Sequence, residues 1–209
     1  MIILSAGMNR SGSTWLYNVL RVILSDFCVK ESWKFNSGWI EDIELIDSDE
    51  SVDLIKLHKF DCSLAARADF IFYSFRDIRD VLASLKRKFN SEPSVKKAEF
   101  LLKEDKDWKG VSDYSMRYED MLADPEKVVL QVSQALNVAC NQPEKILDNI
   151  KGLSYESEGK KNHLYNKVNL FHAGHITNGG THTWENDVPK SVIDEIEKRF
   201  SHWLKENHY

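Results

Sequence analysis

The sequence is poor in the features that mark several protein classes. Its 209 residues include only three cysteines, Cys28, Cys62 and Cys140, and only four prolines. An odd number of cysteines without pairs at metal-ligand spacing argues against a disulfide scaffold or a zinc site and is typical of a reducing compartment. No internal repeat or low-complexity tract is present. We therefore expect a soluble, cytoplasmic globular protein that holds no metal.

The chain also lacks a basic excess and a long apolar run. Lys and Arg total 28 against 33 Asp and Glu, a net charge of −5, so bulk binding to nucleic acid or to an anionic membrane is not expected. The apolar opening at residues 1–6 is too short to span a bilayer and carries no basic leader. A length of 209 residues suits one core better than two. We predict a single domain over residues 1–209; the oligomeric state cannot be inferred from this pattern.

Short apolar segments alternate with helical patterns along the chain. Strands are predicted at 2–6, 52–57, 70–75 and 114–118, and amphipathic helices after the first and third strands and at 124–137, 141–151 and 188–207. The stretch 26–51 is interpreted as irregular structure with at most one short strand, and 154–187 as loop. The loops at 26–50, 90–110 and 155–175 are candidates for binding a substrate. This alternation predicts an α/β three-layer sandwich on a mostly parallel sheet, with its site at the carboxyl ends of the strands.

The turn after the first strand has the glycine spacing of a phosphate-binding loop. It reads Gly7-Met8-Asn9-Arg10-Ser11-Gly12-Ser13-Thr14, and backbone N–H groups there would form an anion site with the helix N-terminus. The Lys that a nucleoside triphosphate loop needs after its second glycine is replaced by Ser13. Arg10, the hydroxyls and Trp15 on the same turn favour an anionic, nucleotide-like ligand.

The residues from Arg10 to Trp15 resemble the 5′-phosphosulfate loop of sulfotransferases that use 3′-phosphoadenosine 5′-phosphosulfate (PAPS). Further elements of that family follow in order. Arg76 at a strand end and Ser84 eight residues later resemble the family's 3′-phosphate element, and Lys56-Leu57-His58 is similar to its Lys-Thr-His. Tyr118-Glu119-Asp120-Met121 resembles its Tyr-Glu-Asp-Met, and Ser154-Tyr155 is a shorter match to a second adenine-contacting segment.

The resemblance implies a role for each matched residue. His58 would take the proton of the acceptor hydroxyl or amine, and Arg10 would stabilise the bridging oxygen as it leaves in an in-line displacement. The N–H groups of residues 11–15, among them Ser11 and Gly12, with the Ser13 and Thr14 hydroxyls would hold the 5′-phosphate. Arg76 and Ser84 would hold the 3′-phosphate, and Trp15, Tyr118 and Tyr155 would contact adenine. The acceptor would be a small molecule or a carbohydrate.

The chain departs from the family near its C-terminus. The cytosolic members clamp the 3′-phosphate with Arg-Lys-Gly, whereas this chain has Thr177, Asn178 and Gly179 at those places. Asn178 and Gly179 are still expected beside the phosphate, with His172, His175 or His182 as further donors. The run Lys86-Arg87-Lys88 is interpreted as a solvated helix face, with an anionic acceptor as the other interpretation.

Two other functions remain open at this point. A P-loop kinase for a small molecule would use ATP and magnesium, and the missing Walker Lys argues against it. A non-catalytic nucleotide-binding protein of the same fold is the third possibility, which His58 beside Lys56 disfavours.

Overall fold

The structure is a computed structural model that describes residues 1–46, 48–157, 164–175 and 178–209. Its centre is a five-stranded sheet in the order β2-β3-β1-β4-β5, and every neighbouring pair is parallel. The strands are β1 (Ile2–Ala6), β2 (Lys34–Trp39), β3 (Ser51–Leu57), β4 (Phe70–Phe75) and β5 (Tyr114–Arg117). β1 lies in the middle, with Ala6 opposite Leu57 of β3 and Ile3 opposite Phe70 of β4. The predicted α/β sandwich on a parallel sheet is confirmed.

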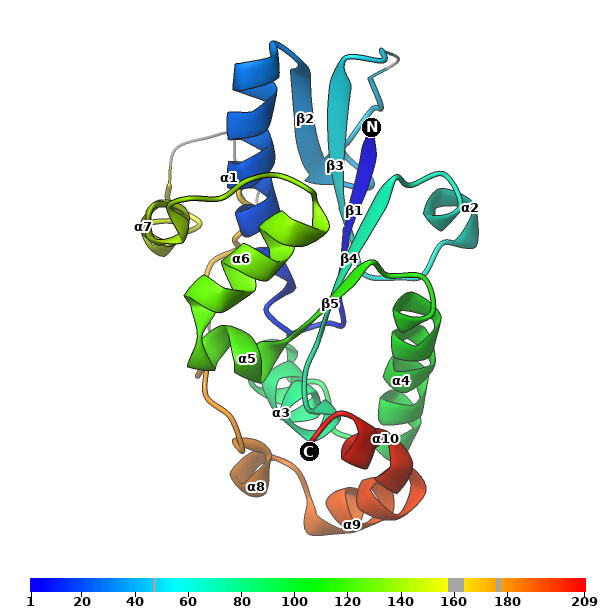
Figure 1. Ribbon diagram of the computed structural model, residues 1–209. Coiled ribbons are helices and arrows are strands. Elements are labelled where there is room, and N and C mark those ends of the chain that lie inside the picture. Colours follow the sequence, from blue (N-terminus) through cyan, green and yellow to red (C-terminus); the bar gives the residue numbers. More distant parts are fainter. Residues whose placement is uncertain (47, 158–163, 176–177) are drawn as a thin grey trace.

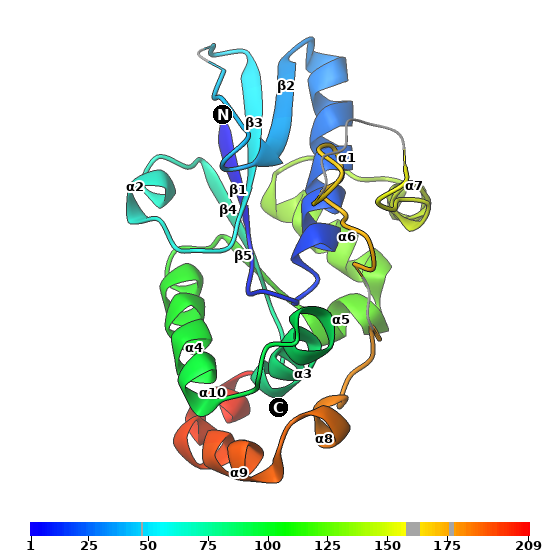
Figure 2. The same ribbon diagram turned by 180° about the vertical axis from the view of Figure 1, so that it is seen from behind.

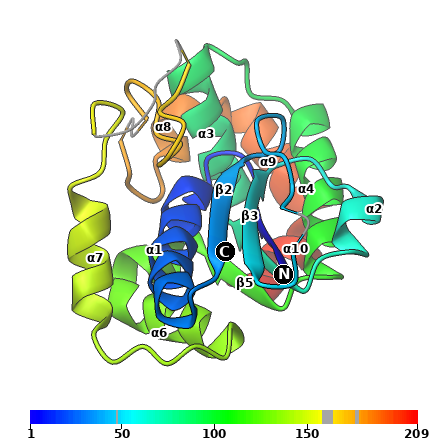
Figure 3. The same cartoon turned by 90° about the horizontal axis from the view of Figure 1, so that it is seen from above.

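Helices cover both faces of this sheet, as Figures 1 and 3 show. One face carries α1 (Ser13–Glu31), α5 (Tyr118–Ala123), α6 (Pro125–Ala135) and α7 (Pro143–Lys151). The core on this side includes Leu16, Leu20 and Val129 from the helices. β1 is buried on both faces and is mostly apolar. β3 is buried along its whole length as well, and its polar residues Ser51, Asp53 and Lys56 are accommodated because each has a hydrogen-bond partner.

The other face carries α3 (Ile78–Phe89), α4 (Val95–Lys109), α9 (Lys190–Arg199) and α10 (Ser201–Glu206), seen from behind in Figure 2. Trp108 of α4 is fully buried there and stacks on Tyr73 of β4. Two short helices, α2 (Cys62–Ala65) and α8 (Trp184–Asp187), lie in the connections.

Two predicted elements were wrong. The stretch 90–110 was interpreted as a candidate substrate loop, but 95–109 is the helix α4, which contributes core residues and not a loop. The single helix predicted at 188–207 is two helices that meet at Phe200. The stretch 26–51 contains the end of α1 and all of β2.

The basic run on α3 is not a solvated face. Lys86 donates to the carbonyl oxygen of Asp187 at 2.9 Å, Arg87 pairs with the carboxylate of Asp187, and Lys88 donates to two carbonyl oxygens of residues 173 and 174. These bonds fasten the segment before α9 across the end of α3. The run is therefore an anchor for the C-terminal third of the chain.

Candidate active site

A cavity of about 670 Å³ is lined by residues that follow β1, β3, β4 and β5. Ten of the residues predicted for the site line it: Arg10, Gly12, Ser13, Thr14, Trp15, His58, Arg76, Ser84, Tyr118 and Gly179. Among the described residues, those that line the cavity include no Asp or Glu. The lining is formed by apolar, aromatic, uncharged polar and cationic side chains, an environment that favours an anionic ligand with flat groups.

The loop between β1 and α1 has a backbone that depends on its two glycines. Gly12 lies in the left-handed region with φ of 76°, and a Cβ there would meet the Tyr118 ring at 3.0 Å. A Cβ on Gly7 would lie 2.4 Å from the Ser74 hydroxyl. Arg10 also has a positive φ, 65°. This conformation lets the loop pass close to β4 and turn straight into α1.

The first turn of α1 presents free N–H groups to the cavity. Leu16 is the first residue whose N–H donates within the helix, to the carbonyl oxygen of Gly12 at 3.1 Å. No residue that the structure describes accepts a hydrogen bond from the N–H groups of residues 12–15. With the positive end of the helix dipole, these groups make an anion cradle at the predicted place.

Ser11 has a different position from its neighbours. Its side chain is fully buried, and its hydroxyl lies 2.6 Å from the Met8 carbonyl oxygen and 2.8 Å from the Ser74 hydroxyl. Its own N–H donates back to Met8. Ser11 therefore does not line the cavity, and the contacts seen here make it a residue that ties the loop to β4.

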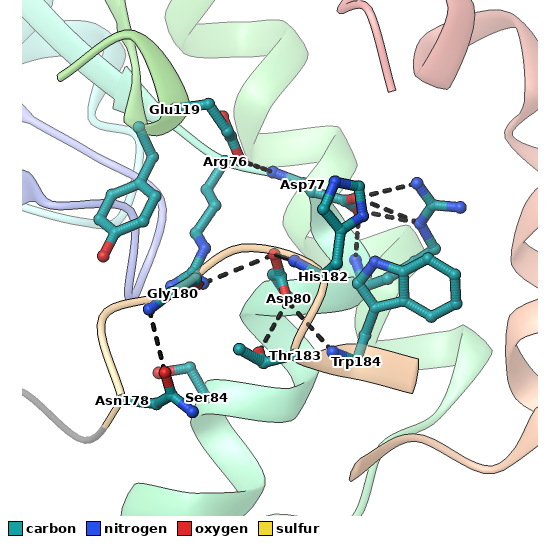
Figure 4. A network of polar contacts seen from close by, with 12 residues as sticks. Arg76, Asp77, Asp80, Ser84, Glu119, Asn178, Gly180, His182, Thr183 and Trp184 are labelled. Carbon is teal, nitrogen blue, oxygen red and sulfur yellow. Dashed lines mark hydrogen bonds and ion pairs between the residues drawn. The ribbon is translucent and has the colours of Figure 1, made fainter. Parts of the chain in front are cut away.

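Arg76 follows β4 and lies at the centre of a buried polar network (Figure 4). Its guanidinium donates to the carbonyl oxygen of Gly180 at 2.6 Å, pairs with Asp80 at 3.6 Å, and lies 4.2 Å above the Tyr118 ring. Its Nε is buried and has no partner among the described residues. Because Arg76 lines the cavity, its guanidinium is suited to bind an anionic group there.

Asp80 holds the residues before α8 in place around Arg76. Its two carboxylate oxygens accept from the N–H of His182 at 2.9 Å, the hydroxyl of Thr183 at 2.7 Å and the N–H of Trp184 at 3.1 Å (Figure 4). Asp80 is 1% exposed. The helix α3 thereby positions both Arg76 and the chain segment that covers it.

Arg10 joins the loop after β1 to α3. Its Nε donates to the Ser84 hydroxyl at 2.9 Å, and its terminal nitrogen donates to the His175 carbonyl oxygen at 2.7 Å. The Arg76 guanidinium in turn donates to the Arg10 carbonyl oxygen at 3.3 Å. Burial and the charge of Arg76 lower the pKa of Arg10, but a guanidinium stays protonated in proteins.

His58 follows β3, and its ring is held in one orientation. Its Nδ1 lies 2.5 Å from the Gly7 carbonyl oxygen, and its ring packs edge-on against Trp39 with 5.3 Å between centroids. A carbonyl oxygen only accepts, so the proton is assigned to Nδ1 and Nε2 keeps its lone pair. Burial and the nearby charge of Lys56 lower the pKa of His58 to about 3. The ring is therefore neutral near pH 7.

Lys56 itself does not line this cavity. Its ammonium donates to the Ser5 carbonyl oxygen at 3.3 Å and is buried beneath Trp39. Burial lowers the pKa of Lys56 to about 7.

Two further predicted residues do not line the cavity. Tyr155 lies in the turn after α7, where its carbonyl oxygen accepts from Asn166 at 3.4 Å. The side-chain oxygen of Asn178 accepts from the N–H of Gly180 at 3.2 Å. Thr177, where the family carries a cation, lies outside the described residues.

Two of the loops predicted to bind a substrate, 26–50 and 155–175, do contribute to the cavity wall: Trp39 at the end of β2 comes from the first, and Tyr165, Leu170 and Phe171 come from the second. Leu122 of α5 lines the cavity as well and was not expected there. His172 and His175, considered only as donors to the 3′-phosphate, line the same cavity.

The described residues contain no group of three or more His, Cys, Asp or Glu side chains that could hold a metal ion. They contain no helix of the length and apolar character needed to cross a membrane.

Comparison with known proteins identifies the family. A family profile described as sulfotransferase domain matches residues 85–208, more than half of the chain. The chain belongs to this family. The match begins within α3, so Arg10, His58 and Arg76 lie before it, and their assignment rests on the loop motifs and the cavity. No protein with a curated description matches the sequence.

Two solved structures have the same fold. Retinol dehydratase, in complex with androsterone and the inactive cofactor PAP, aligns with a TM-score of 0.63 and 15% identity over 99% of this chain and 80% of that one. Mouse sulfotransferase SULT7A1, complexed with PAP, aligns with a TM-score of 0.67 and 14% identity over 97% of this chain and 84% of that one. The expected sulfotransferase fold is thereby confirmed.

Proposed function

We propose that this sulfotransferase moves a sulfuryl group from PAPS to a hydroxyl or amine of a small-molecule or carbohydrate acceptor. The observation that carries the proposal is the single cavity in which the loop at 9–15, His58 and Arg76 meet, although they follow three different strands. Two cationic donors and a set of free amides suit a ligand with two separated anionic groups. The PAP found in both structural relatives is such a ligand.

The two phosphate groups of PAPS would be held by different elements of the fold. The N–H groups of residues 12–15 with the Ser13 and Thr14 hydroxyls would bind the 5′-phosphate, and Arg76 with Ser84 would bind the 3′-phosphate. The position of Arg76 and Ser84 in the same cavity wall supports this role. Trp15 and Tyr118 would contact the adenine ring, and their positions in the cavity wall support this role.

The chemistry follows from the protonation states. Nε2 of His58 accepts the proton of the acceptor group as the acceptor atom bonds to sulfur. The sulfur–oxygen bond to the donor's bridging oxygen breaks, and that oxygen keeps the electron pair. Arg10 stabilises the resulting charge and gives up no proton, because its guanidinium remains protonated. The negative charge of a bound donor raises the proton affinity of His58 at the moment when it must act.

Ligand binding tests the donor half of this proposal. Thermal shift is measured with PAP (adenosine 3′,5′-bisphosphate), with 5′-AMP, and with ATP plus magnesium, since a ligand stabilises the state it binds. PAP should stabilise the protein more than 5′-AMP, and R76A should abolish that difference. The control is R67A, at an exposed arginine of the α2–β4 connection, which should leave the difference unchanged. Stabilisation by ATP and magnesium but not by PAP would refute the proposal and favour the kinase.

A sulfuryl-transfer assay tests the catalytic half of this proposal. Labelled PAPS is offered with a panel of phenols, alcohols, amines and sugars, and the acceptor that becomes labelled is used to compare variants. H58A should lose at least about a hundredfold in turnover, the usual contribution of a general base, with PAP affinity nearly unchanged. Full turnover of H58A would show that the base is another group.

A further inference from the structure

The chain segment at 165–175 forms a built wall of the cavity. Asn166 and Asn169 are almost fully buried, and Asn18 of α1 donates to the Asn169 carbonyl oxygen at 2.8 Å. At the other end of the segment, Lys88 donates to the carbonyl oxygens of Ala173 at 2.6 Å and Gly174 at 2.8 Å. Side chains from α1 and α3 thus fix both ends of the wall, and the residues that it presents have a defined position.

This wall brings two imidazole rings beside Arg10. The rings of His172 and His175 lie 4.2 Å apart, and Phe171 packs edge-on against His175 at 4.8 Å. Arg10 donates to the backbone carbonyl oxygen of His175 at 2.7 Å. His175 therefore lies next to the guanidinium assigned to the leaving oxygen, in the same cavity as His58.

The environment of His175 determines which ring nitrogen carries the proton. Nδ1 is buried and has no partner among the described residues, while Nε2 is not enclosed and makes no hydrogen bond to them. An unpartnered N–H costs more when it is buried than an unpartnered ring lone pair, so the proton is assigned to Nε2. Burial and the charges of His172, Arg10, Lys88 and Lys56 lower the pKa of His175 to about 3, so the ring is neutral with one donor.

We propose that the Nε2–H of His175 donates a hydrogen bond to an oxygen of the sulfuryl group that is being transferred, beside Arg10. This inference rests on the proposed function and deepens it by adding a residue that contacts the reacting group. His175 gives up no proton: the acceptor proton goes to His58, and the bridging oxygen leaves with its electron pair. Because no carboxylate lines the cavity among the described residues, no acidic side chain of the wall competes for this donor.

The test compares two ligands that differ only in the sulfuryl group. Dissociation constants for PAPS and for PAP are measured without acceptor on the wild type, H175A and H175Q. A hydrogen bond to a charged group contributes enough for H175A to bind PAPS about tenfold more weakly, with PAP affinity changed less than about twofold. The Gln amide can still donate, so H175Q should recover most of the PAPS affinity. H202A, at a mostly exposed histidine of α10, is the matched control and should change neither ligand.

Turnover adds a second measurement. With the acceptor found in the screen, H175A should lower kcat with little change in the KM for acceptor, because the contact is to the transferring group. Equal losses of PAPS and PAP affinity, not restored in H175Q, would show that His175 only supports the wall and would overturn the inference. Unchanged PAPS affinity in H175A would overturn it as well. Failure of the proposed function would give a different result from failure of this inference. In that case the wild type itself would bind neither PAPS nor PAP, or would transfer no label to an acceptor.

Discussion

Asp80 offers the sharpest test of how the site is held together. D80A removes a carboxylate that accepts from the His182 N–H, the Thr183 hydroxyl and the Trp184 N–H, and that pairs with Arg76 at 3.6 Å. Both side chains of the pair are almost completely buried, 4% and 1% exposed. The variant therefore leaves a buried guanidinium without its counter-charge and three donors without an acceptor.

The expected magnitude follows from these contacts. Removing one partner of a buried ion pair costs about 3–5 kcal/mol, and each buried donor left unpaired costs about 1–3 kcal/mol. These contributions overlap, because the same carboxylate satisfies all of the groups. We expect the free energy of unfolding to fall by about 3–5 kcal/mol, and Tm by roughly 6–20 °C for a chain of this size.

Urea unfolding followed by circular dichroism measures this loss. D80N keeps the size of the side chain and removes its charge. Its free energy of unfolding should fall less than that of D80A, because the amide oxygen can still accept a hydrogen bond. D148A, at an exposed position of α7, is the control and should stay within about 0.5 kcal/mol of the wild type. A loss below about 1 kcal/mol in D80A would refute the reasoning, since it would mean that water replaces the carboxylate without penalty.

Two other predictions concern the loop between β1 and α1 and the buried His58. G7A places a Cβ 2.4 Å from the Ser74 hydroxyl and 2.5 Å from Ser13 Cβ; it should cost about 1–3 kcal/mol in urea unfolding and weaken PAP binding in a titration, whereas G152A, where a Cβ meets nothing within 4 Å, should do neither. Native PAP affinity in G7A would show that the close approach of the loop to β4 is dispensable. His58 has a pKa of about 3 in the folded protein and about 6.5 when unfolded, so the unfolded chain binds the extra proton between these values. The free energy of unfolding should therefore fall as pH is lowered from about 6.5 towards 3, by up to about 1.4 kcal/mol per pH unit from this residue, and H58Q should reduce that slope in urea titrations at stepped pH. An equal slope in H58Q would mean that His58 titrates normally in the fold.

The centre of the fold and much of the site were predictable from the sequence. β1 and β4 are short, apolar and bounded by polar turns, so their limits at 2–6 and 70–75 match the prediction. Residues that follow parallel strands meet at one edge of the sheet. That rule, with the loop motif, was enough to bring Arg10, His58 and Arg76 into one cavity.

The helix α4 was missed although its buried residues follow a helical period. They are Ala98, Leu101, Leu102, Asp105 and Trp108. Asp105 hides the pattern, because a carboxylate is not expected in a core. It is buried here because it accepts from the Tyr73 hydroxyl at 3.0 Å and the Trp203 ring nitrogen at 2.7 Å and pairs with Lys109 at 3.0 Å. These partners are distant in sequence, except for Lys109.

The sequence marked 155–175 as a candidate substrate loop, but the conformation of the wall at 165–175 could not be predicted, for a different reason. Its conformation depends on side-chain to backbone hydrogen bonds rather than on a repeating apolar pattern. Asn166 accepts from the N–H of Val168 at 2.9 Å, and Asn169 accepts from that of Phe171 at 2.9 Å. In the sequence, such bonds are visible only as asparagines, and asparagines are equally typical of turns without such structure.

The strand order has a consequence for how such an enzyme can diverge. The two halves of the sheet on either side of β1 contribute different parts of the cavity: β2 and β3 lead to Trp39 and His58, and β4 and β5 lead to Arg76 and Tyr118. The connection after Trp39 can therefore be exchanged for a longer or differently shaped one without disturbing the residues proposed to grip the nucleotide. A change at that edge of the sheet would reshape the cavity beside Trp39 while Arg76 and Tyr118, which follow β4 and β5, keep their positions.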